Sequence, residues 1–287
     1  MRPIETLPPF TAPPPGAFVY NASAHKSLDR CARLWAFQYL LGVGENSEGS
    51  EGPQAFGTAL HKIAEDFVAA RIAPDPFAPQ VNAGSKDRPR WLSPSQTFLR
   101  GANTLTGIVD GNPHCEAERK FSFEIRGIWY KGTADLEAPG GWGVSDSVHQ
   151  HHDGTPGYAV PLIVDYKTTS GVRWALTPET LRTDPQFILY AMAVFVANPQ
   201  VMLVRGLWLY FNKIPRGSEP PFWRVPVEIL RSDCEALFAK IVEPNARKMA
   251  TLSTRVGLPI VDPRIPRKGY PLRNFDHVSN TDRKSVV

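Results

Sequence analysis

The chain has 287 residues, of which 42% are hydrophobic and 21% are charged. This balance is typical of a globular protein with a substantial core, and it excludes a chain that is disordered throughout. The formal net charge of +4 and the pI near 9.0 favour a polyanionic partner, although many basic proteins bind none.

The cysteines and the apolar segments bear on where the protein works. Cys31, Cys115 and Cys234 are far apart and form neither a disulfide framework nor a CxxC metal pair, which favours a reducing compartment. The first sixteen residues lack an apolar segment, so we expect no signal peptide. The most apolar stretch, residues 187–197, has about half the length that a membrane-spanning helix needs. The sequence predicts a soluble, cytoplasmic protein with no membrane partner.

The predicted elements begin after a proline-rich arm, residues 1–18, that we expect to be extended or disordered. Apolar residues at helical spacing predict helices over 23–41, 58–71 and 95–109, separated by a flexible loop over 42–54 and an irregular connection over 73–94. Alternating or short apolar runs predict strands over 119–126, 128–137 and 162–164.

The second half of the chain continues this mixed pattern. A nearly all-apolar helix is predicted over 185–197, capped by Asp184, and strands are predicted over 203–211 and 222–229. An amphipathic helix over 232–252 and a basic tail, residues 256–287, complete the chain. We therefore expect one α/β domain over 19–255, in which helices flank a mixed central sheet and the N-terminal helices pack on it.

The most informative motif ends the predicted strand at 162–164 and reads Asp165-Tyr166-Lys167. Strand side chains alternate, so Asp165 and Lys167 project from one face. A carboxylate can hold a hard divalent cation while an amine orients water or offsets charge that grows on phosphorus. An Asp-x-Lys pair is also a common cross-face ion pair, so the motif alone does not establish this chemistry.

Two further groups could reach the same cation. Asp135, in Gly132-Thr133-Ala134-Asp135, lies on the preceding strand of a predicted hairpin, and Glu137 on the same face is an alternative ligand. His61 lies beside the apolar stripe of its helix, where a neutral imidazole is either a metal ligand or a structural histidine. Glu65, one turn further on, is either an auxiliary group or a surface carboxylate.

A polar pair, Gln186 and Tyr190, lies four residues apart on the apolar helix over 185–197. A helix that is buried so completely seldom carries polar side chains without partners. The pair either serves the site or bonds to nearby backbone.

In this order and spacing, the motifs at Gly57…His61, at Gly132–Asp135, at Ile163–Thr168 and at Gln186…Tyr190 resemble the RecB-type nucleases of the PD-(D/E)xK superfamily. The resemblance covers roughly residues 20 to 215 and includes an N-terminal helix that matches residues 23–31. It implies a restriction-endonuclease-like core and DNA as the partner. It also implies that the protein acts in the cytoplasm of a bacterial or phage-infected cell.

The resemblance also implies roles for individual residues. His61, Asp135, Asp165 and the backbone carbonyl of Tyr166 would bind Mg²⁺ or Mn²⁺, and Lys167 would be catalytic. Gln186 and Tyr190 would help to position the DNA strand or a water at the metal.

The sequence departs from this family in two places. Asp135 and Asp165 are thirty residues apart, wider than a short hairpin, and the insertion over about 138–160 contains His149, His151, His152 and Asp153. These four side chains are either a metal site or incidental. Some relatives carry an iron–sulfur cluster on one N-terminal and three C-terminal cysteines; only Cys31 and Cys234 are available here, so we expect no iron–sulfur cluster.

The predicted function is a metal-dependent deoxyribonuclease, most consistent with an exonuclease. The alternatives are an endonuclease and a non-catalytic DNA-binding or partner module on the same fold. No Walker-type phosphate loop is visible in the sequence, so an ATP-driven helicase or a recombination protein would be a separate partner.

Overall fold

The computed structural model describes residues 7–41, 52–84, 87–112, 114–139 and 160–255. Its main feature is a mixed six-stranded sheet in the order β1-β5-β6-β7-β8, with β4 paired to β5 as well. The strands are β1 (Val19–Tyr20), β4 (Glu116–Ile125), β5 (Ile128–Ala138), β6 (Leu162–Thr169), β7 (Leu203–Asn212) and β8 (Phe222–Leu230). Strands β6 and β7 are parallel, β1 is parallel to β5, and the other neighbours are antiparallel.

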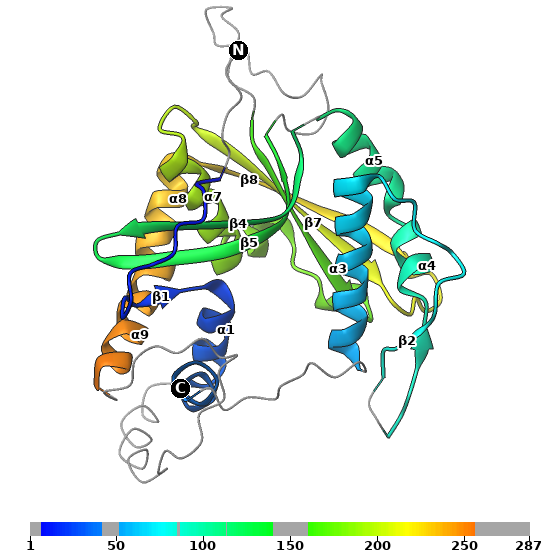
Figure 1. Ribbon diagram of the computed structural model, residues 1–287, viewed down its shortest axis with the longest axis horizontal. Helices are drawn as coiled ribbons and strands as arrows, with labels where there is room; N and C mark the ends of the chain where they lie inside the picture. The colour runs from blue at the N-terminus through cyan, green and yellow to red at the C-terminus, as the bar shows by residue number, and fades with distance from the viewer. Residues whose placement is uncertain (1–6, 42–51, 85–86, 113, 140–159, 256–287) are drawn as a thin grey trace, which may run out of the picture.

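Helices cover both faces of this sheet (Figure 1). One face carries α3 (Pro53–Ala70), α4 (Pro94–Leu99) and α5 (Ala102–Asp110), and the other carries α1 (Ala22–Arg30), α7 (Pro185–Ala197), α8 (Arg231–Leu237) and α9 (Glu243–Arg255). The buried side chains form two clusters, which we call the α7-side core and the α3-side core. The mixed sheet flanked by helices that the sequence predicts is confirmed, with the N-terminal helix α1 packed against α7.

Helix α7 shows how local chemistry produces an element. Its N-cap, Asp184, accepts a hydrogen bond from the Gln186 backbone N–H at 2.8 Å, and Pro185 occupies the first turn, where no N–H is needed. Apolar side chains surround nearly the whole helix, and most of them are completely buried. The helix therefore fills the α7-side core, and its few polar side chains must find partners there.

Three predicted helices differ from the observed ones. The helix predicted over 23–41 starts from an Asn21 cap and is broken at Cys31, whose extended backbone (φ −168°) separates α1 from α2 (Ala32–Trp35) and a π-helical turn, η1 (Ala36–Leu40). Helix α3 starts at Pro53, five residues earlier than predicted, because proline suits a first helical turn. The helix predicted over 95–109 is two helices, α4 and α5, which meet at Gly101.

Other segments are more ordered than their composition suggests. The arm from Leu7 onward is not disordered: Leu7 is fully buried, its N–H donates to Glu137 Oε1 at 2.8 Å, and Thr11 exchanges two hydrogen bonds with Ser122. The connection at 73–94 contains a small hairpin of β2 (Val81–Asn82) and β3 (Trp91–Leu92). Side chains of β4 and β5 (Ser122 and Glu137) bond to the backbone of the arm, and Leu7 is buried in the core, which the prolines of the arm alone would not indicate.

The end of the chain follows the prediction in outline. The C-terminal helix over 232–252 is observed as α8, a π-helical turn, η3 (Phe238–Val242), and α9. Residues 1–6, residues 42–51 of the loop predicted over 42–54, most of the insertion (140–159) and the basic tail (256–287) lie outside the described residues. Among the described helices, none combines the length and the apolar character that crossing a membrane requires.

Strands β5 and β6 pair over only three residue pairs, from Leu136↔Val164 to Ala138↔Leu162. Beyond that point β6 stays with β7, and β5 stays with β4 and reaches β1 at Trp129 and Tyr130. The buried even-numbered residues of β5 change sides here: Ala134 belongs to the α7-side core and Leu136 to the α3-side core. The sheet thus opens into a seam between β5 and β6, starting at Asp135 and Asp165.

Candidate active site

The two predicted acidic ligands lie at the start of this seam. Where the β5–β6 ladder stops, the Tyr166 N–H donates to Asp135 Oδ2 at 2.6 Å. The Asp135 carboxylate therefore takes the place of the backbone carbonyl that would accept this hydrogen bond if β5 and β6 stayed paired. The bond places Asp135 beside Asp165 although thirty residues separate them in the sequence, and the structure brings together the two motifs.

His61 approaches the same place from α3. Its Nε2 lies 3.0 Å from the Tyr166 carbonyl oxygen, and its Nδ1 lies 3.4 Å from Asp135 Oδ1. Burial lowers the pKa of His61, but the hydrogen bond to Asp135 and the charges of Asp135 and Asp165 outweigh burial and raise the pKa above its ordinary value of 6.5. The imidazole and the Tyr166 carbonyl, both predicted ligands, thus converge on one spot.

Asp165 and Lys167 form an ion pair on the α7 side of β6, with a buried carboxylate and a partly exposed amine. The Asp165 side chain is 2% exposed and one of its oxygens, Oδ2, contacts Lys167 Nζ. Burial, opposed by Lys167 and reinforced by Asp135, raises the pKa of Asp165 to about 6. Burial lowers the pKa of Lys167, but Asp165 and Asp135 raise it by more, so the amine stays charged at neutral pH.

Gln186 and Tyr190 join the two sides of the seam. Gln186 Nε2 donates to Asp165 Oδ1 at 2.7 Å and to the Tyr190 hydroxyl at 2.9 Å. The Tyr190 hydroxyl donates to the Thr133 carbonyl oxygen of β5 at 2.6 Å. These hydrogen bonds connect β6, α7 and β5. Of the two acidic residues, Asp165 is the one that Gln186 contacts directly.

Glu118, on β4, also faces the site and was not singled out by the sequence reasoning. The β4–β5 ladder has no residue pair at Glu118 and Asp135, and Glu118 adopts φ 50°, a left-handed conformation that is uncommon for residues other than glycine. Its Oε1 lies 4.0 Å from His61 Nδ1. Burial, then the charge of Asp135, raises its pKa. The available clue was that Glu118 directly precedes the strand predicted over 119–126, next to the predicted strand that carries Asp135. The left-handed backbone of Glu118 cannot be predicted from the sequence.

Other candidates lie away from this group. Glu137 does not share a face with Asp135 in the way that strand alternation predicts, because β5 twists between them; Glu137 instead accepts from the Leu7 N–H and pairs with Arg119. Glu65 forms an exposed ion pair with Lys62. His149, His151, His152 and Asp153 fall outside the described residues.

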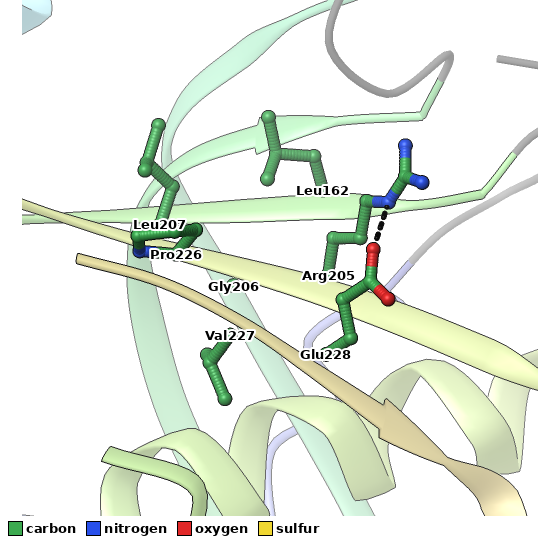
Figure 2. Close-up of a pocket in the computed structure, with 7 residues that line it drawn as sticks. All are labelled: Leu162, Arg205, Gly206, Leu207, Pro226, Val227 and Glu228. Carbon is green, nitrogen blue, oxygen red and sulfur yellow. Dashed lines mark hydrogen bonds and ion pairs between the residues drawn. The ribbon is translucent and has the colours of Figure 1, made fainter. Parts of the chain in front are cut away.

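A pocket of about 230 Å³ opens at the far end of the same strands (Figure 2). Its floor is apolar, with Leu162, Leu207 and Pro226, and its polar groups are the Arg205–Glu228 pair at 2.7 Å. It contains none of the motif residues, and an ion pair of this kind is an ordinary surface contact. This pocket is therefore not the catalytic centre.

The donor atoms fit a divalent cation. Ligand atoms of His61, Glu118 and Asp135 all lie within 4.8 Å of one another, and the Tyr166 carbonyl oxygen lies 3.0 Å from His61 Nε2. Asp165 is the residue before Tyr166 and is not part of this group of three. Carboxylate and carbonyl oxygens suit Mg²⁺, and an added imidazole suits Mn²⁺ better. The site contains three carboxylates, one lysine and one histidine. The carboxylates outnumber the basic groups, and a cation would offset the excess negative charge.

An α/β core with an acidic, lysine-bearing seam of this kind defines a class of metal-dependent nucleases. The sequence model of the PD-(D/E)XK nuclease superfamily matches residues 20–253, and the chain belongs to that superfamily. Nucleases of this superfamily use divalent metal ions. The predicted superfamily is thus confirmed.

Two solved structures are similar at low sequence identity. A candidate exonuclease from Eubacterium rectale aligns over 84% of this chain and 82% of its own, with 12% identity and a TM-score of 0.49. SSO0001 aligns over 52% of this chain and 58% of its own, with 14% identity and a TM-score of 0.26. Both scores are too low to support a functional inference. A search of curated proteins finds no match.

Proposed function

We propose that this protein is a Mg²⁺- or Mn²⁺-dependent deoxyribonuclease of the RecB type that degrades DNA from an end. The observation that supports it best is the convergence of His61, Asp135, Asp165 and Lys167 on the seam between β5 and β6. The net charge of +4 is consistent with a polyanionic substrate.

The residues divide into three roles. His61, Asp135, Asp165 and the Tyr166 carbonyl oxygen hold the cation, and Glu118 is an additional candidate ligand because of its place in the same cluster. When bound, the cation supplies positive charge beside the scissile phosphate and acidifies a water molecule. Lys167, which remains an ammonium group, offsets negative charge on the phosphate in the transition state.

Gln186 and Tyr190 are positioning residues in this proposal. Gln186 holds one oxygen of Asp165, and Tyr190 anchors Gln186 to the backbone of β5. These two neutral side chains therefore fix the orientation of Asp165 without adding a charge to the site. This explains why a polar pair lies on an otherwise apolar helix.

The role of Glu118 is tested by Glu118→Gln, which keeps the shape of the side chain and removes its charge. The affinity for Mn²⁺, measured by calorimetric titration, should fall, whereas Glu65→Gln, at an exposed ion pair, should leave it unchanged. Equal affinities for the two variants would remove Glu118 from the ligand set.

The function is tested with linear and covalently closed circular DNA, each with Mg²⁺, with Mn²⁺ and with EDTA. We expect the linear molecule to disappear much faster than the circle, and EDTA to stop both reactions. Equal loss of both forms would point to an endonuclease. Binding without cleavage in either metal would point to a non-catalytic DNA-binding module.

A further inference from the structure

An exposed tryptophan lies just beyond the strand that carries Asp165 and Lys167. After β6 the chain forms a short 3₁₀ turn, η2 (Val172–Trp174), whose side chains are all exposed, and Trp174 is 64% exposed. The Arg173 guanidinium lies 4.9 Å from the centre of the Trp174 ring. Single exposed apolar residues are common on protein surfaces, so exposure alone implies no role.

The backbone that carries this tryptophan is fixed. Hydrogen bonds run from the Trp174 N–H to the Gly171 carbonyl oxygen at 3.2 Å and from the Ala175 N–H to the Val172 carbonyl oxygen at 2.9 Å. Ala175 and Leu176 then pack against the α7-side core. Helix α6 (Pro178–Arg182) follows at once, with a complete capping box at Thr177. A large aromatic ring is thus held out to solvent on an anchored segment.

The anchor also places the ring beside the proposed site. The Leu176 N–H donates to the Tyr210 hydroxyl at 3.1 Å, and Tyr210 is the residue on β7 that pairs with Lys167 on β6. Paired residues of adjacent strands project from the same face, and the strands lie about 4.8 Å apart. Trp174 is two residues, at most roughly 7 Å of chain, from Leu176. One nucleic acid strand can therefore contact both Lys167 and Trp174.

We propose that Trp174 and Arg173 form a stacking platform for an unpaired base of the strand that is cut. This rests on the nuclease function proposed above. Aromatic rings accept any base, because every base has a π face, and an adjacent guanidinium adds a cation–π contact and a charge for the phosphates. A base inside a duplex already stacks on its neighbours, so the platform selects single-stranded nucleotides next to the scissile bond.

The test is equilibrium binding of a fluorescent single-stranded oligonucleotide in EDTA, where no cleavage occurs. Trp174→Leu keeps an apolar side chain and removes the aromatic face. The Kd should rise between about fivefold and about 150-fold, the range that one stacked base contributes. Trp174→Phe should bind within about twofold of the wild type, because phenylalanine keeps a ring.

Two controls separate stacking from other effects. Phe77→Leu removes an aromatic ring that is 90% exposed, on the connection that follows the C-terminal end of α3. This change should leave the Kd unaltered. An oligonucleotide with abasic sites should bind the wild type as weakly as the intact strand binds Trp174→Leu, and Trp174→Leu should not discriminate between the two strands.

The outcomes distinguish this platform from the nuclease proposal. Equal Kd values for wild type and Trp174→Leu, with cleavage of linear DNA intact, would overturn the platform alone. A stacking-dependent Kd without cleavage in Mg²⁺ or Mn²⁺ would support the platform and overturn the nuclease. No binding and no cleavage by the wild type would overturn both. A change in oligomeric state on Trp174→Leu, measured by sedimentation, would assign the ring to a contact between copies and overturn the platform.

Discussion

At the scale of single residues, the site places two groups of opposite charge, Asp165 and Lys167, on one face of β6. In the proposed function the Asp165 carboxylate binds the cation, whereas the Lys167 amine stays charged because Asp165 and Asp135 raise its pKa. Substituting one or the other should therefore affect different steps.

We expect Asp165→Asn to reduce both cation affinity and cleavage, because few carboxylates hold a magnesium ion. Lys167→Ala should keep the affinity for cation and DNA while the chemical step slows by on the order of 10²–10⁴-fold, the usual contribution of one electrostatic or proton-transfer group. Calorimetric titration beside single-turnover cleavage measures the two effects. Near wild-type cleavage by Lys167→Ala would refute the site assignment.

Cleavage should also decline as the pH falls through about 6. The pKa of Asp165 is raised by burial to about 6, and that of His61 lies above 6.5 because Asp135 and Asp165 outweigh burial. Below these values both groups carry the protons that a cation must displace, and above them both are free to bind it. A higher cation concentration should move the midpoint of the pH profile to lower pH. A midpoint that does not depend on cation concentration would contradict this competition.

At the scale of elements, α7 connects the two halves of the sheet through one buried hydroxyl. Tyr190→Phe removes the donor to the Thr133 carbonyl oxygen and an acceptor for Gln186. We expect the free energy of unfolding to fall by about 1–3 kcal/mol, because buried partners lose a hydrogen bond.

Tyr130→Phe is a matched control for this change. Within the described part of the chain, the buried Tyr130 hydroxyl has no hydrogen-bond partner, so its removal should leave the stability unchanged or increase it. Urea denaturation of both variants measures the difference. A loss for Tyr130→Phe as large as that for Tyr190→Phe would show that the α7 hydrogen bonds are not what stabilises the seam.

The elements also show how far sequence alone leads. Helix α7 is predicted from its first residue to its last, because a cap, a proline and a continuous apolar run act locally. His61, Asp135, Asp165 and Lys167 are predicted as a group and lie together. The break at Cys31, the left-handed backbone of Glu118 and the twist that turns Glu137 away from Asp135 depend on packing between distant segments, which local patterns do not contain.

At the scale of the whole molecule, the N-terminal arm extends the fold beyond the matched family region. Leu7 is fully buried and its N–H is bonded to Glu137 of β5. We expect Leu7→Ala to lower the free energy of unfolding by about 2–5 kcal/mol, as for other leucines in cores.

Phe10→Ala is the comparison on the same arm. Phe10 is 50% exposed, so its loss should cost clearly less than that of Leu7. The free energies of unfolding of the two variants, measured by thermal or chemical denaturation, test whether the arm is part of the core. Similar, small effects for both would mean that the arm contributes little to stability.

The short β5–β6 ladder has a consequence for how this enzyme can vary in evolution. Asp135 and Asp165 are aligned by the pairs from Leu136↔Val164 to Ala138↔Leu162 and by the Asp135–Tyr166 hydrogen bond. None of these contacts depends on how many residues join Ala138 to Leu162. Doubling the length of a flexible connection costs only about 0.6 kcal/mol in closure entropy. A change in the number of residues between Ala138 and Leu162 should therefore leave the two carboxylates in place, so a sequence search that assumes a narrow spacing between them would overlook proteins with longer connections.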